Sequence, residues 1–298
     1  MTNPFAELSQ SMAAATAQAG NSLVRVEARR RLPASGLIWS ADGLIITAHH
    51  VVQRDEQIGI GLPDGSTVHA TLIGRDPTTD LALLQAEASG LTPLTEASLK
   101  EVAVGQLVLA LGRPGRSVQA TLGVISALGD GWRTHMGGQI DRYLQTDVVM
   151  YPGFSGGALI NAHGQVIGLN SSALARGASL AVPAMTLARV VESLQTHGRV
   201  RRGYLGVSTQ RVHLPNPLQK ELGQKSGLLV VSVEEGSPAE AGGLTLGDTI
   251  VGVDSETVMN HDDLLALLTS TPVDTAVTVH IVRGGQKQKV VVTIGERP

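Results

Sequence analysis

The sequence predicts a mainly β protein that consists of two antiparallel barrels and a small α+β module. From Ser22 to about Val182, short apolar stretches alternate with turn signals such as Asp42-Gly43 and Asp64-Gly65. The chain has 35 glycines in 298 residues but only 2% aromatic residues, so we expect a core of Val, Leu, Ile and Ala. After residue 203 the pattern changes to fewer, longer strands that enclose two short helices.

The first part of the chain contains about a dozen candidate strands, a number that suits two small barrels better than one. We expect them at residues 22–28, 36–39, 43–47, 57–62, 67–74, 81–85, 107–111, 120–128, 140–146, 157–161, 166–170 and 179–182. An amphipathic helix is then expected over Met185–Gln195, with Gly198 as its stop signal.

Residues 3–20 are expected to form a helix before the first strand. Asn3 can cap it, Pro4 suits its first position, and Gly20 can end it. One face carries Phe5, Leu8, Met12 and Ala15. The segment can be a frayed leader or a docking segment for another subunit, and the sequence leaves both possibilities open.

The module after residue 203 is expected to have strands at 228–233, 249–253, 276–282 and 287–294. Its first helix opens with Ser237-Pro238-Ala239-Glu240, a capping box with proline at the first position, and its second covers Asn260–Leu268. The predicted domains are an N-terminal segment (1–21), the two barrels with their helix (22–198), a basic linker (199–203) and the α+β module (204–298).

Composition excludes several classes of function. The net charge of −3 gives no reason to expect nucleic acid, and the absence of cysteine excludes disulfides, thiol catalysis and cysteine-bound zinc. The histidines lack metal-ligand spacing, and neither a metal nor a cofactor is expected. No apolar run approaches the roughly 18 residues that a membrane span requires. Because no secretory signal is evident, we expect a cytoplasmic protein.

The run Tyr151-Pro152-Gly153-Phe154-Ser155-Gly156-Gly157 places one serine among glycines. Such a turn is often structural, but it can also direct the amides of Gly153 and Ser155 toward one point, which suits the oxyanion of acyl transfer. A nucleophilic serine needs an oriented base. Upstream of Ser155, a His-His pair lies in Thr47–Val52 and two candidate carboxylates lie in Asp76–Leu84. This His, Asp, Ser order is the chymotrypsin order.

The same run also satisfies the G-x-S-x-G elbow of α/β-hydrolases, so that alternative has to be tested. An elbow requires a helix directly after the serine, with the Asp and the His further along the chain. Here residues 157–161 and 166–170, joined by His163-Gly164, predict a β-hairpin instead. We therefore reject the hydrolase elbow.

These motifs, together with the single module after the helix, resemble an HtrA/Deg serine protease with one C-terminal PDZ domain. The resemblance covers Ser22 to Ile294 and implies a double β-barrel of chymotrypsin type. It makes His50, which directly precedes Val-Val, the general base, with His49 as its neighbour. Asp80 would orient His50, while Asp76, which precedes a proline, would cap a turn. Ser155 would be the nucleophile, and the amides of Gly153 and Ser155 would form the oxyanion hole.

The resemblance also implies two binding sites. Val149, Met150 and Leu169 would line the pocket for the residue on the acyl side of the cut, and small or medium aliphatic residues would fit there better than Lys or Arg. In the PDZ domain, Tyr204-Leu205-Gly206-Val207 would hold a peptide C-terminus, and the peptide would add a strand to the sheet edge. Leucines of Asn260–Leu268, including Leu264 and Leu268, would form the apolar pocket or belong to the core.

Three positions depart from the family pattern. Phe154 replaces an asparagine, Ala158 replaces a proline, and Leu128-Gly129-Asp130 lacks the arginine that relays activation in relatives, a role that Arg133 could take. The resemblance implies an endopeptidase for unfolded or misfolded polypeptides in protein quality control, without a cofactor and regulated by its PDZ domain. It also implies a homotrimer joined through N-terminal segments. The alternative is a proteolytically idle scaffold or chaperone-like protein.

Overall fold

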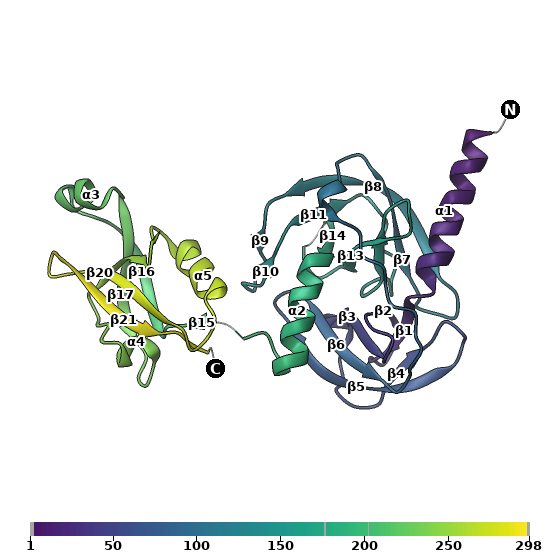
Figure 1. Ribbon diagram of the computed structural model, residues 1–298, viewed down its shortest axis with the longest axis horizontal. Coiled ribbons are helices and arrows are strands. Elements are labelled where there is room, and N and C mark those ends of the chain that lie inside the picture. The colour runs from purple at the N-terminus through teal and green to yellow at the C-terminus, as the bar shows by residue number, and fades with distance from the viewer. Residues whose placement is uncertain (1–2, 176, 202, 297–298) are drawn as a thin grey trace. The chain divides into compact units, whose positions relative to one another are not determined.

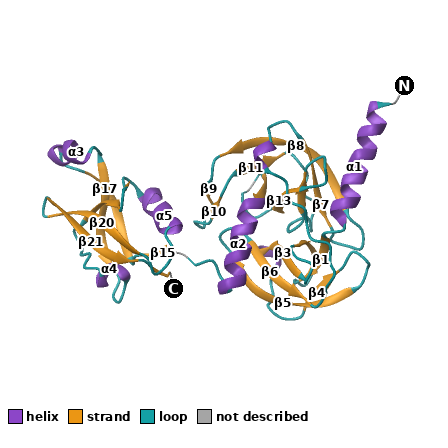
Figure 2. Ribbon diagram, viewed as in Figure 1, coloured by secondary structure: helices purple, strands orange, loops and turns teal. Residues whose placement is uncertain are grey.

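The computed structural model of the protein describes residues 3–175, 177–201 and 203–296. The chain forms two compact units, Met1–Val200 and Arg201–Pro298, and their boundary falls inside the segment that was expected to be a linker (Figure 1). The first unit contains two closed barrels and the second an α+β sheet structure, so the predicted mainly β fold class is confirmed (Figure 2).

The first barrel has six antiparallel strands in the order β1-β2-β3-β6-β5-β4, closed by pairing of β1 with β4. The strands are β1 (Leu23–Glu27), β2 (Ala34–Ile38), β3 (Leu44–Ala48), β4 (Ile58–Gly61), β5 (Thr67–Asp76) and β6 (Leu81–Ala86). Its interior is filled by aliphatic side chains, among them Leu37, Ile46 and Leu83, which are fully buried. Apolar burial of this kind is the main stabilising contribution to a barrel whose strands contain no Phe, Tyr or Trp.

The second barrel also has six strands, in the order β11-β14-β13-β12-β7-β8. They are β7 (Leu107–Gly112), β8 (Gln119–Gly129), β11 (Tyr143–Thr146), β12 (Ala158–Ile160), β13 (Val166–Ser171) and β14 (Ser179–Pro183). The predicted strand 140–146 is interrupted, because β10 (Gln139–Ile140) pairs with β9 (Trp132–Arg133) instead. Asp141 causes the break: its amide donates to Thr186 Oγ1 at 2.9 Å, and its carboxylate binds Arg189 at 3.0 Å.

Two helices accompany the barrels. Helix α1 (Pro4–Gly20) is capped by Asn3, whose Oδ1 accepts a hydrogen bond from the Phe5 amide at 3.1 Å; it runs through Gly20, and its C-cap is Asn21. Helix α2 (Ala184–His197) ends at Gly198, which has a left-handed φ of 69°. No helix in the described part of the chain is long and apolar enough to span a membrane.

The second unit contains all the predicted strands and both predicted helices. Its sheet has the order β16-β17-β18-β20-β21 with the short β19 beside β18. The elements are β15 (Gly203–Tyr204), β16 (Val207–His213), α3 (Asn216–Leu222), β17 (Ser226–Val233), α4 (Pro238–Ala241), β18 (Thr249–Val253), β19 (Glu256–Thr257), α5 (His261–Ser270), β20 (Ala276–Arg283), β21 (Gln286–Thr293) and β22 (Gly295–Glu296). The sequence did not predict strand β16 or the short helix α3. Strand β16 is an edge strand with mostly polar side chains, and its residues are exposed or half-buried.

Candidate active site

His50 lies in a single turn of 3-10 helix, η1 (His49–Val51), which directly follows strand β3 of the first barrel. Its Nδ1 lies 2.8 Å from Asp80 Oδ2 and 3.0 Å from Asp80 Oδ1, and its backbone amide donates to Asp80 Oδ1 at 2.9 Å. The carboxylate therefore holds both the ring and the backbone of His50. With the Nδ1 proton donated to Asp80, Nε2 is the nitrogen that can accept a proton from a nucleophile.

The neighbouring histidine has a different environment. His49 Nδ1 is buried and has no hydrogen-bond partner within the described residues. Burial, reinforced by the positive charge of Arg75, lowers the pKa of His49, so this ring stays neutral over most of the physiological range. Of the two histidines, the structure brings His50 to the carboxylate.

Asp80 is held in an unusual backbone conformation, with φ of 58°. The preceding turn is stabilised by Asp76, whose Oδ1 accepts from the Thr78 amide at 3.1 Å and whose Oδ2 accepts from Thr79 Oγ1 at 2.7 Å. Asp76 therefore acts as a turn cap. The left-handed conformation of Asp80 costs free energy in a non-glycine residue and is typical of functional sites.

Ser171 is a further partner of Asp80 that the sequence analysis missed. This buried residue ends strand β13 of the second barrel, and its hydroxyl donates to Asp80 Oδ2. The carboxylate of the first barrel is thus hydrogen bonded to the second. One position further along the chain, Ser172 Oγ lies 3.1 Å from Ser155 Oγ, so the candidate nucleophile contacts the residue that follows Ser171.

Ser155 is also tied to the first barrel. Its carbonyl accepts from the Ser35 amide at 3.2 Å, and a Cβ added to Gly156 would lie only 2.4 Å from Thr47 Oγ1, on the strand that leads to His50. Of the three predicted triad residues, His50 and Asp80 are in direct contact, and Ser155 is hydrogen bonded to residues of both barrel regions, Ser35 and Ser172. In the described chain Ser155 Oγ makes no hydrogen bond to His50; its partner is Ser172 Oγ.

The turn before the nucleophile presents two amides that have no acceptor among the described residues, those of Gly153 and Ser155. Gly153 has φ of 94°, a region that favours glycine. Its carbonyl is held by Ser35 Oγ at 2.7 Å, and the same hydroxyl accepts from the Arg113 amide at 2.7 Å. Ser35 thus fixes the orientation of the turn, a role that the sequence analysis did not assign.

The family departure at Phe154 has a structural explanation. Its side chain is fully buried in the core of the second barrel and makes an edge-on contact with Tyr151, with ring centroids 5.9 Å apart. Gly112 leaves room for the ring, because a Cβ there would lie 2.8 Å from Phe154 Cδ1. The aromatic ring anchors the nucleophile turn in the core. Ala158, the second departure, is a buried residue of β12 opposite Leu169.

The residues expected to form the acyl-side pocket have unequal exposure. Val149 is 57% exposed, Met150 packs against the core of the second barrel, and Leu169 is fully buried in strand β13. Their role in a pocket stays a prediction. Beside His50 the structure has a cavity that was not expected, lined by His49, His50, Pro77, Thr78, Asp80, Thr134, His135, Met136, Ala173 and Leu174.

The loop that carries Asp130 and Arg133 reaches the first barrel beside this cavity. Thr134 Oγ1 donates to the Thr78 carbonyl at 2.7 Å, and Arg133 donates to the Gly137 carbonyl at 3.2 Å. The loop is therefore hydrogen bonded to Thr78, two residues before Asp80 in the chain. No group of three or more acidic or histidine side chains suited to a metal ion is present in the described residues.

The second unit has a groove between the edge strand β16 and helix α5. All six residues predicted to bind a peptide line it; the full lining is Gly203, Tyr204, Leu205, Gly206, Val207, Ser208, Thr209, Glu234, His261, Leu264, Leu265 and Leu268. Gly206 has φ of 80°, and a Cβ there would lie 2.2 Å from Ser237 Cβ. At one point His261 Nε2 lies 2.8 Å from the Thr209 carbonyl, which links the helix to the edge strand.

Two six-stranded barrels with His, Asp and Ser at their seam define a chymotrypsin-like serine protease fold. Comparisons with known proteins agree: residues 34–169 match the trypsin-like peptidase domain family, and residues 203–294 match the PDZ domain family. A probable periplasmic serine endoprotease, DegP-like, from Ectopseudomonas mendocina is 38% identical over 89% of this chain. The chain spans 56% of the length of that relative.

Solved structures cover the chain more fully. The HtrA-type protease AlgW with a tripeptide is 32% identical, covers 96% of this chain and 97% of its own, and has a TM-score of 0.77. A serine endoprotease from Yersinia pestis is 31% identical, covers 96% of this chain and 98% of its own, and has a TM-score of 0.78. The chain belongs to the HtrA family of serine proteases with a trypsin-like domain and one PDZ domain.

Proposed function

We propose that the protein is a serine endopeptidase that cleaves unfolded or misfolded polypeptides. The observation that carries this proposal is the continuous set of contacts from His50 through Asp80 and Ser171 to Ser172 and Ser155. The turn at Ser155 also has two amides that find no acceptor among the residues described. Rotation of the Ser155 side chain from Ser172 toward His50 Nε2 completes the triad. His50 then takes the hydroxyl proton as Ser155 attacks the carbonyl, and returns it to the leaving amine.

The amides of Gly153 and Ser155 supply the electrostatic part of the catalysis. They point toward the position where the carbonyl oxygen becomes an oxyanion, and preorganised donors of this kind each contribute about 10²- to 10³-fold in rate. Ser35 keeps the turn in this shape because it binds the Gly153 carbonyl, which lies in the chain between the two amides. No step requires a cofactor or a metal.

We infer a preference for small or medium aliphatic residues on the acyl side of the cut. The predicted pocket residues Val149, Met150 and Leu169 are all apolar, so they offer no partner for a Lys or Arg side chain. The substrate must reach the site as an extended strand, which requires local unfolding and suits a role in protein quality control. Cleavage-site mapping on a denatured protein tests both points: frequent cuts after Lys or Arg would contradict the pocket assignment.

We propose that the PDZ groove binds a peptide C-terminus and thereby regulates cleavage. Strand β16 is an edge strand of its sheet, so a peptide can pair with it, and Leu264 and Leu268 line the groove beside it. The related AlgW structures contain a tripeptide and a decapeptide. An apolar C-terminal peptide is expected to bind saturably and to change the rate of casein digestion; equal binding of the same peptide with an amidated terminus would contradict the site.

A fluorophosphonate probe tests the catalytic proposal. The probe should modify Ser155 in the wild-type protein, whereas Ser155→Ala should remain unlabelled and should digest casein at least about 10⁴-fold more slowly. Circular dichroism should show that this variant keeps the fold. Absence of labelling both with and without a PDZ ligand would instead favour a proteolytically idle scaffold. This is the second candidate function because Ser155 Oγ is hydrogen bonded to Ser172 Oγ.

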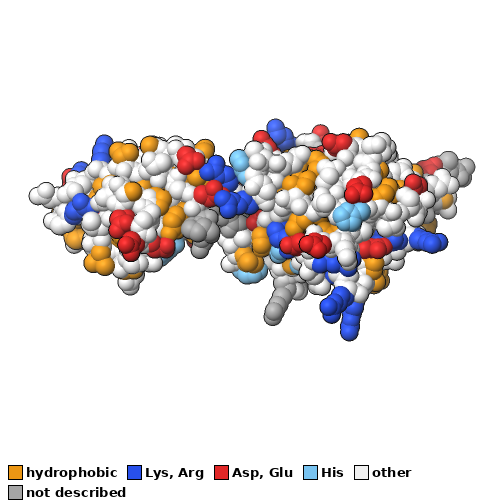
Figure 3. Space-filling view, turned by 90° about the horizontal axis from the view of Figure 1, so that it is seen from below, with side chains coloured by type: hydrophobic (Ala, Val, Ile, Leu, Met, Phe, Trp, Pro, Cys, Tyr) orange, Lys and Arg blue, Asp and Glu red, His pale blue; other side chains and the backbone are white. Residues whose placement is uncertain are grey.

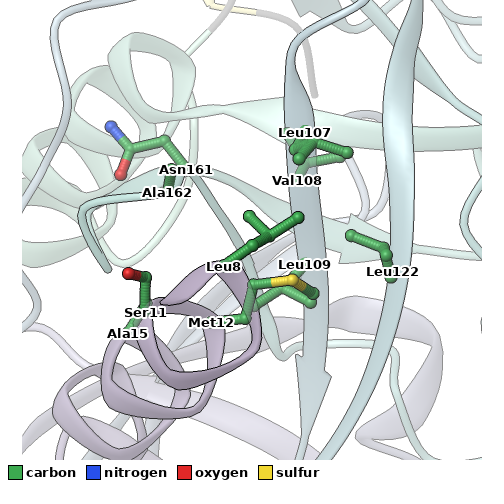
Figure 4. Close-up of a pocket in the computed structure, with 10 residues that line it drawn as sticks. All are labelled: Leu8, Ser11, Met12, Ala15, Leu107, Val108, Leu109, Leu122, Asn161 and Ala162. Carbon is green, nitrogen blue, oxygen red and sulfur yellow. The ribbon is translucent and has the colours of Figure 1, made fainter. Parts of the chain in front are cut away.

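We also propose that copies of the chain assemble through helix α1 into a trimer. Phe5 is 78% and Leu8 is 42% exposed on this helix. Figure 4 shows Leu8 and Met12 facing Leu109 and Leu122 across an apolar pocket between α1 and strands β7 and β8. A second copy would cover this exposed apolar surface.

Light scattering tests the assembly. The double substitution Phe5→Ser/Leu8→Ser is expected to shift the protein toward monomer, whereas Leu246→Ser, which changes a leucine that is 72% exposed in the PDZ unit, should not. An unchanged mass for the first variant would contradict assembly through α1.

The cellular compartment of the protein also stays a prediction: the sequence favoured the cytoplasm, while the DegP-like relatives are named periplasmic. Cell fractionation of the tagged protein decides between the two.

A further inference from the structure

Three consecutive arginines, Arg29, Arg30 and Arg31, occupy the short loop between strands β1 and β2. Arg29 is half-buried, and its Nε donates to the Leu32 carbonyl at 2.5 Å, so it holds the loop. Arg30 and Arg31 are exposed, and neither forms an ion pair with any residue that the structure describes. A run of like charges in a short loop is unfavourable unless an anion compensates it.

This loop lies against the nucleophile turn. A Cβ added to Gly153 would lie 2.9 Å from the Pro33 carbonyl oxygen and 2.5 Å from Pro114 Cβ. Pro114 belongs to the loop between β7 and β8, which carries the exposed Arg116. Both loops that border Gly153 therefore carry exposed guanidinium groups. We call Arg30, Arg31 and Arg116 the arginine rim.

The direction of the substrate follows from the contacts of Ser155. Ser172, the residue after strand β13, borders Ser155, and we place the acyl half of an extended substrate at this strand end. The scissile carbonyl points to the amides of Gly153 and Ser155. The leaving half must then continue past Gly153, toward Pro33 and the arginine rim.

We propose that the arginine rim selects an acidic side chain in the segment that follows the scissile bond. An extended chain advances about 3.3 Å per residue. Arg31 and Arg30 precede Pro33 by two and three residues in a bent loop, and we assign them to the second and third residues beyond the cut. A guanidinium group binds a carboxylate through two parallel hydrogen bonds, which makes Asp or Glu the matching partner.

A peptide carboxylate fits this surface better than nucleic acid does. Binding of nucleic acid depends on many phosphate contacts along an extended basic surface. The chain has a net charge of −3, and over the face shown in Figure 3 basic and acidic side chains are interspersed. The arginine rim has three exposed guanidinium groups on the two loops that border Gly153, a number that suits one or two acidic residues.

The proposal rests on the proposed peptidase activity, and matched peptides test it. The peptides share the residues up to a Val at the cut and differ only at the second and third positions after it, where they carry Asp-Asp, Asn-Asn or Lys-Lys. Initial rates at low substrate give kcat/KM at about 20 mM and at about 0.5 M salt. At low salt the Asp-Asp peptide should be cleaved about 3- to 10-fold faster than the Asn-Asn peptide, and the difference should shrink at high salt.

Two variants and a control test whether the preference for the Asp-Asp peptide depends on the loop between strands β1 and β2. Arg30→Gln/Arg31→Gln should remove most of the preference, and Arg30→Glu/Arg31→Glu should reverse it in favour of the Lys-Lys peptide. Lys100→Gln/Lys289→Gln changes the net charge as much as the first variant, at two exposed lysines outside both loops, and should keep the preference. Fluorophosphonate labelling of Ser155 is measured in parallel for every protein.

The outcomes separate the two proposals. A wild-type protein that is not labelled and cleaves none of the peptides would refute the peptidase activity itself. A labelled protein that cleaves the three peptides at equal rates, or one whose preference survives the charge reversal, would overturn the role of the arginine rim. Binding of a DNA duplex that disappears in the Arg30→Gln/Arg31→Gln variant, without any effect on peptide selection, would also overturn it and would favour a polyanion site.

Discussion

Replacing Ser35 by alanine would release the nucleophile turn without touching a triad residue. The Ser35 hydroxyl is fully buried, donates to the Gly153 carbonyl at 2.7 Å and accepts from the Arg113 amide at 2.7 Å. A buried polar group that loses its partner costs about 1–3 kcal/mol. If the loss of the hydrogen bond to the Gly153 carbonyl raises the free energy of the active conformation of the turn by this amount, the population of that conformation drops about 5- to 150-fold.

The assay compares kcat/KM on a Val-containing peptide with the second-order rate of fluorophosphonate labelling. Both should fall by a similar factor in Ser35→Ala, because both need the oxyanion site. Ser22→Ala is the matched control: this hydroxyl is also buried and donates to a backbone carbonyl, that of Pro93 at 3.0 Å, but it has no contact with the nucleophile turn.

Thermal unfolding of both variants separates stability from catalysis. Both substitutions are expected to lower the melting temperature, and Ser35→Ala more than Ser22→Ala. The first leaves the buried Gly153 carbonyl and the Arg113 amide without partners, whereas the second affects only the carbonyl of Pro93, an exposed residue. Only the first should lower the rate at a temperature where both proteins are folded. A Ser35→Ala protein that is folded and retains kcat/KM within twofold of the control would refute the assigned role of this hydroxyl.

Three further predictions follow from individual contacts. Ser172→Ala removes the alternative partner of the nucleophile, so the rate of fluorophosphonate labelling should stay equal or rise, by up to about tenfold; a large fall would contradict it. Phe154→Ala should destabilise the protein by about 3–5 kcal/mol in urea unfolding, whereas Tyr151→Ala, which changes a side chain that is 55% exposed, should cost much less. In the PDZ unit, burial alone would raise the pKa of Asp248, but hydrogen bonds from Arg283 and Thr245 lower it below its ordinary value of 3.8. Because the unfolded chain then binds the proton more readily, this contribution to stability is present above about pH 4 and is lost as the pH falls further. The protection of strands β18 and β20 against hydrogen exchange should therefore decrease as the pH falls below about 4. In Asp248→Asn this protection should depend less on pH.

The elements that the sequence predicted well share a local pattern. Each predicted strand of the barrels has apolar residues bounded by turn signals, and Gly198 ends helix α2 in the left-handed conformation that glycine allows. Strand β16 escaped prediction because its side chains are polar at most positions, so no apolar alternation marks it. The predicted strand 140–146 is split because Asp141 contacts helix α2. This contact joins residues far apart in the chain, so the local sequence pattern does not predict it.

The candidate active site likewise combines residues that lie in recognisable sequence motifs with residues whose role depends on contacts between distant parts of the chain. The candidate triad could be selected from the sequence because His50, Asp80 and Ser155 lie in short motifs that appear in chymotrypsin order. Ser171 and Ser35 carry no such motif. Each is a single hydroxyl at a strand, and its importance depends on which carbonyl or carboxylate the other barrel places opposite it. Short motifs can indicate candidate reacting groups, whereas the donors that orient them depend on contacts between the two barrels.

Phe154 shows how a departure from a family pattern can be judged from physical chemistry. Position 154 lies between the two amides that form the candidate oxyanion site, so a change there could have disabled the turn. Its amide donates to the Tyr151 carbonyl at 3.0 Å, and its ring is fully buried. The side chain therefore points away from the reacting groups and into the core, where burial of a phenyl ring contributes more stability than an asparagine would. The departure replaces a polar residue with a hydrophobic anchor and leaves the Gly153 and Ser155 amides free to act.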